Sequence, residues 1–175
     1  MSRFIFSVKL SKNLKNIDFF VILDILIINI SIFFGSVFMK TERLFQFAKN
    51  MAEMSDFDRQ KLGCVIACKR SIIGMGFNTN KTHPMQKEYN KLRFQGDNTP
   101  HCLHAEMHAL MPLRNLDVDW NKVSVFIYRL SKNGKNKAAY ARPCPACMAY
   151  MKKLGIKHIY YTTSESYVHE ILDID

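Results

Sequence analysis

The chain has 175 residues, a formal net charge of +10 and five cysteines. This length supports one globular domain with a sizeable core and excludes two comfortable ones. An odd number of cysteines, two of them in a CxxC arrangement, argues against a disulfide framework and favours a metal or redox site in a reducing, cytoplasmic compartment. The basic charge favours phosphate-bearing partners, but the lysines and arginines are scattered, as on an ordinary solvated surface.

Residues 1–38 differ in composition from the rest of the chain, since residues 19–38 are mostly Ile, Phe, Leu and Val. A membrane anchor is one interpretation, because a spanning helix needs about 20 apolar residues. Against it, Asp24 in the membrane would cost about 2.5–3.5 kcal/mol. A leader preceding a functional start at Met39 fits better, and a packed extra element is the third interpretation. We therefore predict an apolar N-terminal extension, residues 1–38, a domain at residues 39–175, and no membrane partner.

The predicted elements begin after residue 40. Thr41 can cap a helix that reaches about Met54 and has a continuous apolar face. Residues 62–67 and 71–77 are short apolar runs that predict a β-hairpin. Residues 78–100 form a long polar connection, and connections of this length are often functional.

Two further strands are predicted at residues 122–130 and 156–163 from their β-branched and aromatic content. Each follows a helix whose expected start, near His104 or Pro143, carries an unusual set of polar residues. Residues 131–142, between the first of these strands and the second helix, form a basic loop with no strand or helix period. The order of elements predicts an α/β domain whose last two strands are parallel across a crossover helix.

The stretch HCLHAEMHAL, residues 101–110, places His104 and Glu106 two positions apart. Residues at this spacing point to different sides of a regular helix, so a pair that meets one ligand belongs at the start of the helix. His108 follows His104 by four, as in zinc proteases, but Ala105 stands where those enzymes need glutamate. We therefore expect His108 to be an ordinary hydrogen-bonded helix residue.

The stretch ARPCPACMAY, residues 141–150, contains two cysteines three positions apart, and Pro143 suits the start of a helix. A helix start lowers the pKa of a thiol, so that the thiolate is available as a ligand. Zinc binds thiolate sulfur and imidazole nitrogen tetrahedrally. His104, Cys144 and Cys147 are therefore candidate metal ligands, with Zn2+ as the cofactor. Glu106 is left as a carboxylate that can move protons between water and a leaving nitrogen.

These two motifs, H-x-E and P-C-x-x-C in this order with a strand between them, resemble the signature of the cytidine and deoxycytidylate deaminase superfamily. The resemblance covers roughly residues 40–165. It implies a three-layer α/β/α sandwich with a central mixed sheet, zinc bound by His104, Cys144 and Cys147, and Glu106 as the catalytic proton shuttle.

Candidate substrate-binding residues lie in the long polar connection and at its start. The tripeptide GFN looks like the strand-end motif that supplies a substrate-binding asparagine in relatives, here Asn78, although a turn residue is equally consistent. Lys81 and His83, with Lys87 and Arg93, are candidates for a phosphate or base pocket, against the alternative of a solvated basic loop.

The predicted function is zinc-dependent hydrolytic deamination of a cytosine-type nucleotide, dCMP or CMP, by a homo-oligomer. Deamination of adenosine in tRNA is the first alternative. The second is a non-catalytic zinc module that binds nucleic acid, with Cys102 closing the zinc tetrahedron; such a module has no use for Glu106. The dozen residues before the P-C-x-x-C motif exceed the usual length in relatives, so the resemblance implies fold and reaction type more strongly than substrate.

Overall fold

The computed structural model of the chain describes residues 41–69, 71–93, 102–132 and 137–174. The interpretation of residues 1–38 as a leader or membrane segment lies outside these ranges, and the division of the chain at residue 39 stays a prediction. No helix within the described ranges is both long and apolar enough to cross a membrane. The expected homo-oligomer and cytoplasmic location also stay predictions.

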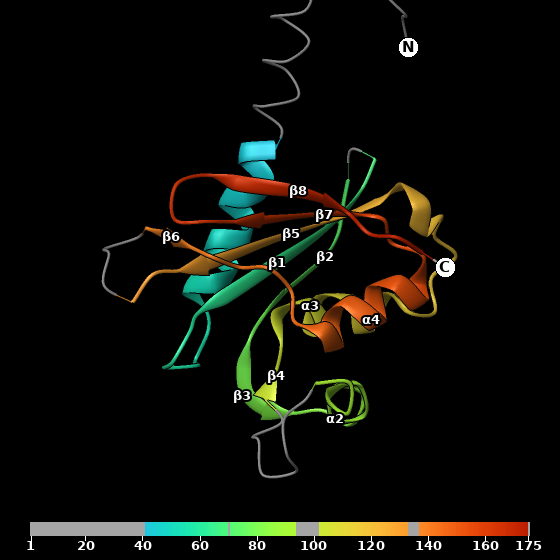
Figure 1. Cartoon of the computed structure of the whole chain (residues 1–175), viewed down its shortest axis with the longest axis horizontal. Coiled ribbons are helices and arrows are strands. Elements are labelled where there is room, and N and C mark those ends of the chain that lie inside the picture. Colours follow the sequence, from blue (N-terminus) through green and yellow to red (C-terminus); the bar gives the residue numbers. More distant parts are fainter. Residues whose placement is uncertain (1–40, 70, 94–101, 133–136, 175) are drawn as a thin grey trace, which may run out of the picture. The chain divides into compact units, whose positions relative to one another are not determined.

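A mixed sheet forms the centre of the domain (Figure 1). Its strands, in spatial order, are β2 (Ser71–Phe77), β1 (Leu62–Cys68), β5 (Val123–Leu130), β7 (His158–Thr162) and β8 (Tyr167–Ile171), and β6 (Ala138–Ala139) pairs with β5. The predicted hairpin is confirmed as β1 and β2, which pair antiparallel. The predicted parallel pair is confirmed as β5 and β7, whereas β1 with β5, β5 with β6 and β7 with β8 are antiparallel.

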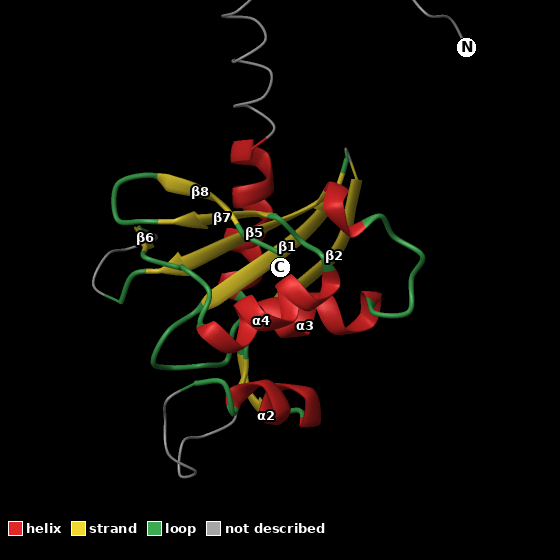
Figure 2. Ribbon diagram, turned by 45° about the vertical axis from the view of Figure 1, so that its right-hand side comes forward, coloured by secondary structure: helices red, strands yellow, loops and turns green. Residues whose placement is uncertain are grey.

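Helices cover both faces of this sheet (Figures 1 and 2). The first described helix covers residues 41–53, which confirms the helix predicted from Thr41 to about Met54. The other helices are α2 (Pro84–Asn90), α3 (Ala105–Leu110) and α4 (Pro145–Leu154), with single 3₁₀ turns η1 (Met111–Leu113) and η2 (Trp120–Lys122).

The alternation of side chains along β1 builds two cores, because successive residues of a strand point to opposite faces. Ile66 is buried with Met107 of α3 and Met151 of α4. The neighbouring Val65 is buried on the other face with Phe45 of the helix over residues 41–53. Figure 2 shows α3 and α4 side by side on one face of the sheet. The predicted three-layer α/β/α arrangement is therefore confirmed.

Two glycines let helices approach the sheet closely. A Cβ atom on Gly63 of β1 would overlap the carbonyl oxygen of Ala48 in the helix over residues 41–53. A Cβ atom on Gly76 of β2 would lie 2.8 Å from the carbonyl oxygen of Ala105 and 2.5 Å from the amide nitrogen of Ala109. The start of α3 is thus seated directly on β2, and this contact fixes where the residues at the start of α3 lie.

Several short elements differ from the sequence-based expectation. The polar connection after β2 contains β3 (Thr79–Thr82) and α2, and β3 pairs with β4 (Cys102–Leu103). The basic loop before α4 contributes β6, and β8 follows the last predicted strand. Each of these elements is seven residues or shorter. The fully buried side chains of α2 are the polar Gln86 and Asn90, and Met85 and Tyr89 pack against the core only in part.

Candidate metal centre and active site

Two helices begin at this site, each preceded by a candidate ligand. His104 is the N-cap residue of α3 and Cys144 is the N-cap residue of α4, both with extended backbone (ψ 152° and 162°). The prediction that His104 and Glu106 lie at a helix start is confirmed. The second helix does not begin at Pro143, because α4 starts at Pro145. Proline is tolerated at this first helical position, where no backbone amide is needed as a hydrogen-bond donor.

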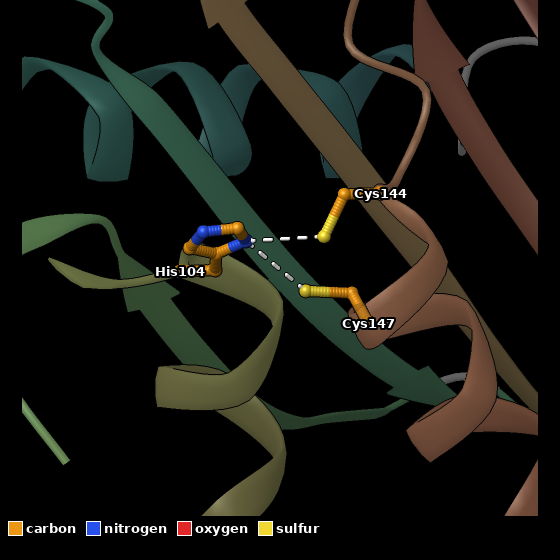
Figure 3. Close-up of side chains that lie close together, drawn as sticks. All are labelled: His104, Cys144 and Cys147. Atoms are coloured by element: carbon orange, nitrogen blue, oxygen red, sulfur yellow. Dashed lines mark hydrogen bonds between the residues drawn. The ribbon is translucent and has the colours of Figure 1, made fainter. Parts of the chain in front are cut away.

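The side chains of His104, Cys144 and Cys147 converge (Figure 3). His104 Nδ1 lies 3.4 Å from the Sγ atom of each cysteine, and the three ligand atoms lie within 4.8 Å of one another. Tetrahedral zinc with one nitrogen and two sulfur ligands separates neighbouring ligand atoms by about 3.4–3.8 Å. The three side chains therefore fit zinc in donor type and in spacing.

The two thiols have opposite pKa shifts. The pKa of Cys144 is lowered to about 4, because the Cys147 thiol donates a hydrogen bond to its sulfur and His104 stabilises the negative charge. The pKa of Cys147 is raised by that same hydrogen bond and by its burial. Position at the N-terminal end of α4 also favours thiolate. One ligand of this centre is thus ionised at neutral pH, as metal binding requires.

A buried polar pair in α2 holds the backbone of His104. The Oε1 atom of Gln86 accepts a hydrogen bond from the His104 amide (3.0 Å), and its Nε2 atom donates to Asn90 Oδ1 (2.8 Å). Gln86 is fully buried. Sequence reasoning missed this support because α2 is only seven residues long and its fully buried side chains are polar. The signal it left is the Gln-to-Asn spacing of four inside a connection already expected to be functional.

Glu106 lies beside the ligand group without belonging to it. Among the described residues, the group able to hold a metal consists of His104, Cys144 and Cys147. The Glu106 side chain is 3% exposed and lines a cavity together with His104 and Cys144. Burial raises the pKa of Glu106, and the nearby charge of His104 opposes that shift. A carboxylate buried next to the centre is available for proton transfer.

The cavity beside the centre has a volume of about 610 Å³. Small-molecule sites in proteins typically measure about 300–1,000 Å³. Besides the centre, the lining includes Cys102, Asn78 and the side chains of Arg59, Arg93 and Arg142. Cys102 is outside the group of ligand atoms that can hold a metal among the described residues.

The predicted substrate-binding residues are distributed unevenly. Asn78 lines the cavity, but its amide is also tied to the backbone at Gln60 and Leu62. Lys81 is exposed and His83 caps α2 by accepting a hydrogen bond from the Met85 amide (3.2 Å). Neither is among the described residues that line the cavity, so their part in substrate binding stays a prediction.

One outcome concerns His108, which was weighed as a metal ligand. His108 makes a 2.9 Å contact from Nδ1 to the Phe77 carbonyl oxygen, which confirms it as an ordinary hydrogen-bonded helix residue. Sequence reasoning did not single out Arg59 and Arg142 as cavity residues. Arg142 lies two residues before Cys144, and its closeness to a candidate ligand could have marked it as a cavity residue. Arg59 is not next to either motif, so nothing in the sequence indicated its position.

Comparison with known protein families decides the assignment. Residues 39–163 match the family described as the cytidine and deoxycytidylate deaminase zinc-binding region. The chain belongs to this family. Zinc is therefore its cofactor, and His104, Cys144 and Cys147 form the group able to hold it. No curated protein sequence matches the chain.

The deaminase fold is also shared with solved structures. The dCMP deaminase from the cyanophage S-TIM5 is 22% identical, with a TM-score of 0.50, over 70% of this chain and 82% of that protein. The cytidine deaminase from Burkholderia pseudomallei is 15% identical, with a TM-score of 0.52, over 74% of this chain and 91% of that protein. At these identities the similarity concerns the fold, a mixed sheet between layers of helices.

Proposed function

We propose that this chain is a zinc-dependent hydrolytic deaminase of a cytosine-type nucleotide, converting dCMP or CMP to dUMP or UMP with release of ammonia. The observation that carries the proposal is Glu106, a buried carboxylate that faces the cavity beside the ligand group and is not part of that group. Membership in the cytidine and deoxycytidylate deaminase family supports the reaction class.

The proposed ligands and their chemistry follow from the geometry. His104, Cys144 and Cys147 would hold the zinc ion through Nδ1 and two thiolates. When bound by three protein ligands, zinc lowers the pKa of water towards neutrality, which supplies a nucleophile. Gln86 keeps the His104 backbone in place for this role.

Glu106 would move the protons of the reaction. Its carboxylate takes a proton from the attacking water while a carbon–oxygen bond forms at the ring carbon that bears the amino group. It then gives that proton to the amino nitrogen, so that the carbon–nitrogen bond breaks and ammonia leaves. Burial of Glu106 keeps this transfer away from bulk solvent, where the proton would be lost.

The size of the cavity favours a free nucleotide as the substrate. A volume of about 610 Å³ is in the range of small-molecule sites and accommodates one nucleotide. Asn78 lines this cavity and retains one N–H donor beyond its contact with Gln60, so it can also reach a substrate.

Ammonia release from dCMP, CMP, cytidine, guanine and adenosine substrates, including tRNA, tests the proposal directly.

The Glu106→Gln protein should bind zinc as the wild type does, and its turnover should fall by a factor of about 10² to 10⁴. Glu165→Gln makes the same chemical change on an exposed loop and should leave zinc binding and turnover unchanged. Full activity in Glu106→Gln would rule out the proton shuttle, and loss of zinc with activity would make Glu106 a ligand. Zinc binding with no turnover of any substrate would favour the non-catalytic module.

A further inference from the structure

The charged residues that line the cavity are unbalanced. Arg59 lies in the segment before β1, Arg93 lies shortly after α2, and Arg142 lies in the segment before α4. Glu106 is the single acidic residue among the described residues of the lining, and no lysine is among them. Charges of one sign gathered in a cleft concentrate ligands of the opposite sign. This cavity therefore favours an anionic ligand.

Arg142 is held in a fixed orientation by neighbouring strands. Its Nε and Nη2 atoms donate to the two carboxylate oxygens of Glu170 in β8 (2.9 and 2.7 Å), and the Tyr161 hydroxyl of β7 donates to the same carboxylate (3.1 Å). A guanidinium has five N–H donors, so two used by Glu170 leave three. An arginine fixed along one edge presents its remaining donors with little loss of side-chain entropy, which suits recognition of a phosphate.

Arg93 has a contact that zinc would remove. Its Nη1 atom lies 3.3 Å from His104 Nε2, whereas His104 Nδ1 faces the two cysteine sulfurs. With a metal on Nδ1, the neutral imidazole carries its proton on Nε2 and becomes a donor there. Arginine is also only a donor, so this hydrogen bond cannot persist in the zinc-loaded protein. The Arg93 guanidinium then becomes available to a ligand in the cavity.

We propose that Arg59, Arg93 and Arg142 form an anion subsite that binds the phosphate of the nucleotide substrate and selects nucleoside monophosphates over nucleosides. The inference rests on the proposed deaminase function and names the phosphate contacts of that same site. It places phosphate selection on arginines from three separate segments and not on the exposed lysines of the connection after β2. Arg59 has no hydrogen-bond or ion-pair partner among the described residues, which leaves its charge free for the ligand.

Paired kinetics on dCMP and deoxycytidine test the subsite. In Arg142→Gln, kcat/KM for dCMP should fall about ten- to hundredfold, the loss of a charge-assisted contact, while kcat/KM for deoxycytidine stays within about twofold. Arg142→Lys keeps the charge but not the fork and should give an intermediate loss. Glu170→Gln should raise KM for dCMP with little change in kcat. Arg114→Gln removes an exposed arginine outside the cavity and controls for net charge.

Two further variants, Arg59→Gln and Arg93→Gln, leave the ion pair between Arg142 and Glu170 intact. In each of them kcat/KM should again fall more for dCMP than for deoxycytidine. Zinc content and thermal unfolding verify that each variant is folded. Equal losses on dCMP and deoxycytidine would show that the arginines only support the structure. Unchanged kinetics on both substrates in all three variants would equally overturn the subsite.

Calorimetry separates failure of the subsite from failure of the proposed function. Zinc-loaded Glu106→Gln protein should bind dCMP at least about tenfold more tightly than deoxycytidine, and adding Arg142→Gln should remove most of that difference. If the wild type releases ammonia from neither dCMP nor CMP, the proposed function fails, and this binding comparison still decides the subsite. Equal affinities, or no binding of either compound at millimolar concentration, would overturn it.

Discussion

The amide of Asn78 joins the end of β2 to the segment that precedes β1. Its Oδ1 atom accepts hydrogen bonds from the Leu62 amide (2.7 Å) and the Ser55 hydroxyl (2.8 Å), and its Nδ2 atom donates to the Gln60 carbonyl oxygen (2.6 Å). The residue is 7% exposed. A buried residue with three such bonds supports the structure whether or not it also touches a substrate.

Replacement of Asn78 by alanine should therefore destabilise the protein. We expect the free energy of unfolding in urea to fall by about 2–4 kcal/mol, because the Leu62 amide loses its partner along with two further bonds. Asn115→Ala, at an exposed position outside the cavity lining, should change this free energy by less than about 0.5 kcal/mol. A raised KM with unchanged stability in Asn78→Ala would instead assign the residue to the substrate alone.

At the scale of single residues, the sequence predicted the centre well and the rest of the cavity poorly. His104 with Glu106, and Cys144 with Cys147, are each set by spacing within one helix start, and local spacing is visible in a sequence. The cavity arginines come from three segments that only the folded sheet brings together. No periodicity in one segment could have indicated that they share a cavity.

Among the elements, β2 and α3 are the pair that most directly sets the position of Glu106. Gly76 allows this contact, since a Cβ atom there would lie 2.5 Å from the Ala109 amide nitrogen. Gly76→Ala must push α3 away from the sheet and should lower the free energy of unfolding by about 1–3 kcal/mol, the usual cost of overpacking. Urea denaturation measures this, and ammonia release should fall as well, because Glu106 moves with α3.

Met75→Ala is the matched control for that change. Met75 belongs to the same strand but is 47% exposed, so its truncation should alter stability by less than about 0.5 kcal/mol and leave activity unchanged. Wild-type stability in Gly76→Ala would mean that α3 can shift without cost, contrary to the close contact described.

The elements predicted from sequence are those with a long apolar pattern. The helix over residues 41–53 and the strands β1, β5 and β7 bury apolar side chains, and β2 packs the partly buried Ile72 and Ile73 against the two cores. β8 was missed because it leaves Val168, His169 and Ile171 exposed and therefore shows no alternation of buried apolar residues. α2 was missed because its buried residues are Gln86 and Asn90, whose hydrogen bonds depend on partners elsewhere in the fold.

The pairing of β7 with β8 should depend on pH. His158 Nδ1 lies 3.1 Å from His169 Nε2, and the His169 ring stacks on Tyr160 with a centroid distance of 4.2 Å. His169 is largely exposed, but its ring is partly desolvated; this lowers its pKa, and the charge of His158 lowers it further. The unfolded chain therefore binds this proton at higher pH than the folded protein does. Stability is then lost as the pH falls below about 6.5 and through the lower pKa of the folded state.

His169→Phe tests this pH dependence, because phenylalanine keeps an aromatic ring against Tyr160 and cannot be protonated. The urea midpoint of the wild type should fall between pH 8 and pH 5, and that of His169→Phe should fall less. Equal falls in the two proteins would show that the loss of stability at low pH arises elsewhere in the molecule.

At the scale of the whole molecule, a net charge of +10 is consistent with a nucleotide substrate and with a nucleic-acid substrate. The salt dependence of substrate affinity distinguishes the two. A protein that neutralises six to ten phosphates of a polynucleotide loses about 10³ to 10⁵ in affinity between 50 and 200 mM salt. A mononucleotide has no condensed counterion atmosphere, so salt only screens its single phosphate contact, and we take a loss of about threefold as the upper bound. The two classes of substrate therefore predict salt dependences that differ by more than a hundredfold.

We expect the mild dependence, because the cavity of about 610 Å³ has room for one nucleotide and its arginines surround one site. The measurement is ammonia release from dCMP, at concentrations below KM, in 50 and 200 mM NaCl, with tRNA added as a competitor in a parallel series. Activity should fall no more than about threefold, and tRNA should inhibit weakly at 200 mM salt. Turnover of tRNA with none of any mononucleotide, together with a steep fall in salt, would transfer the assignment to adenosine deamination in tRNA.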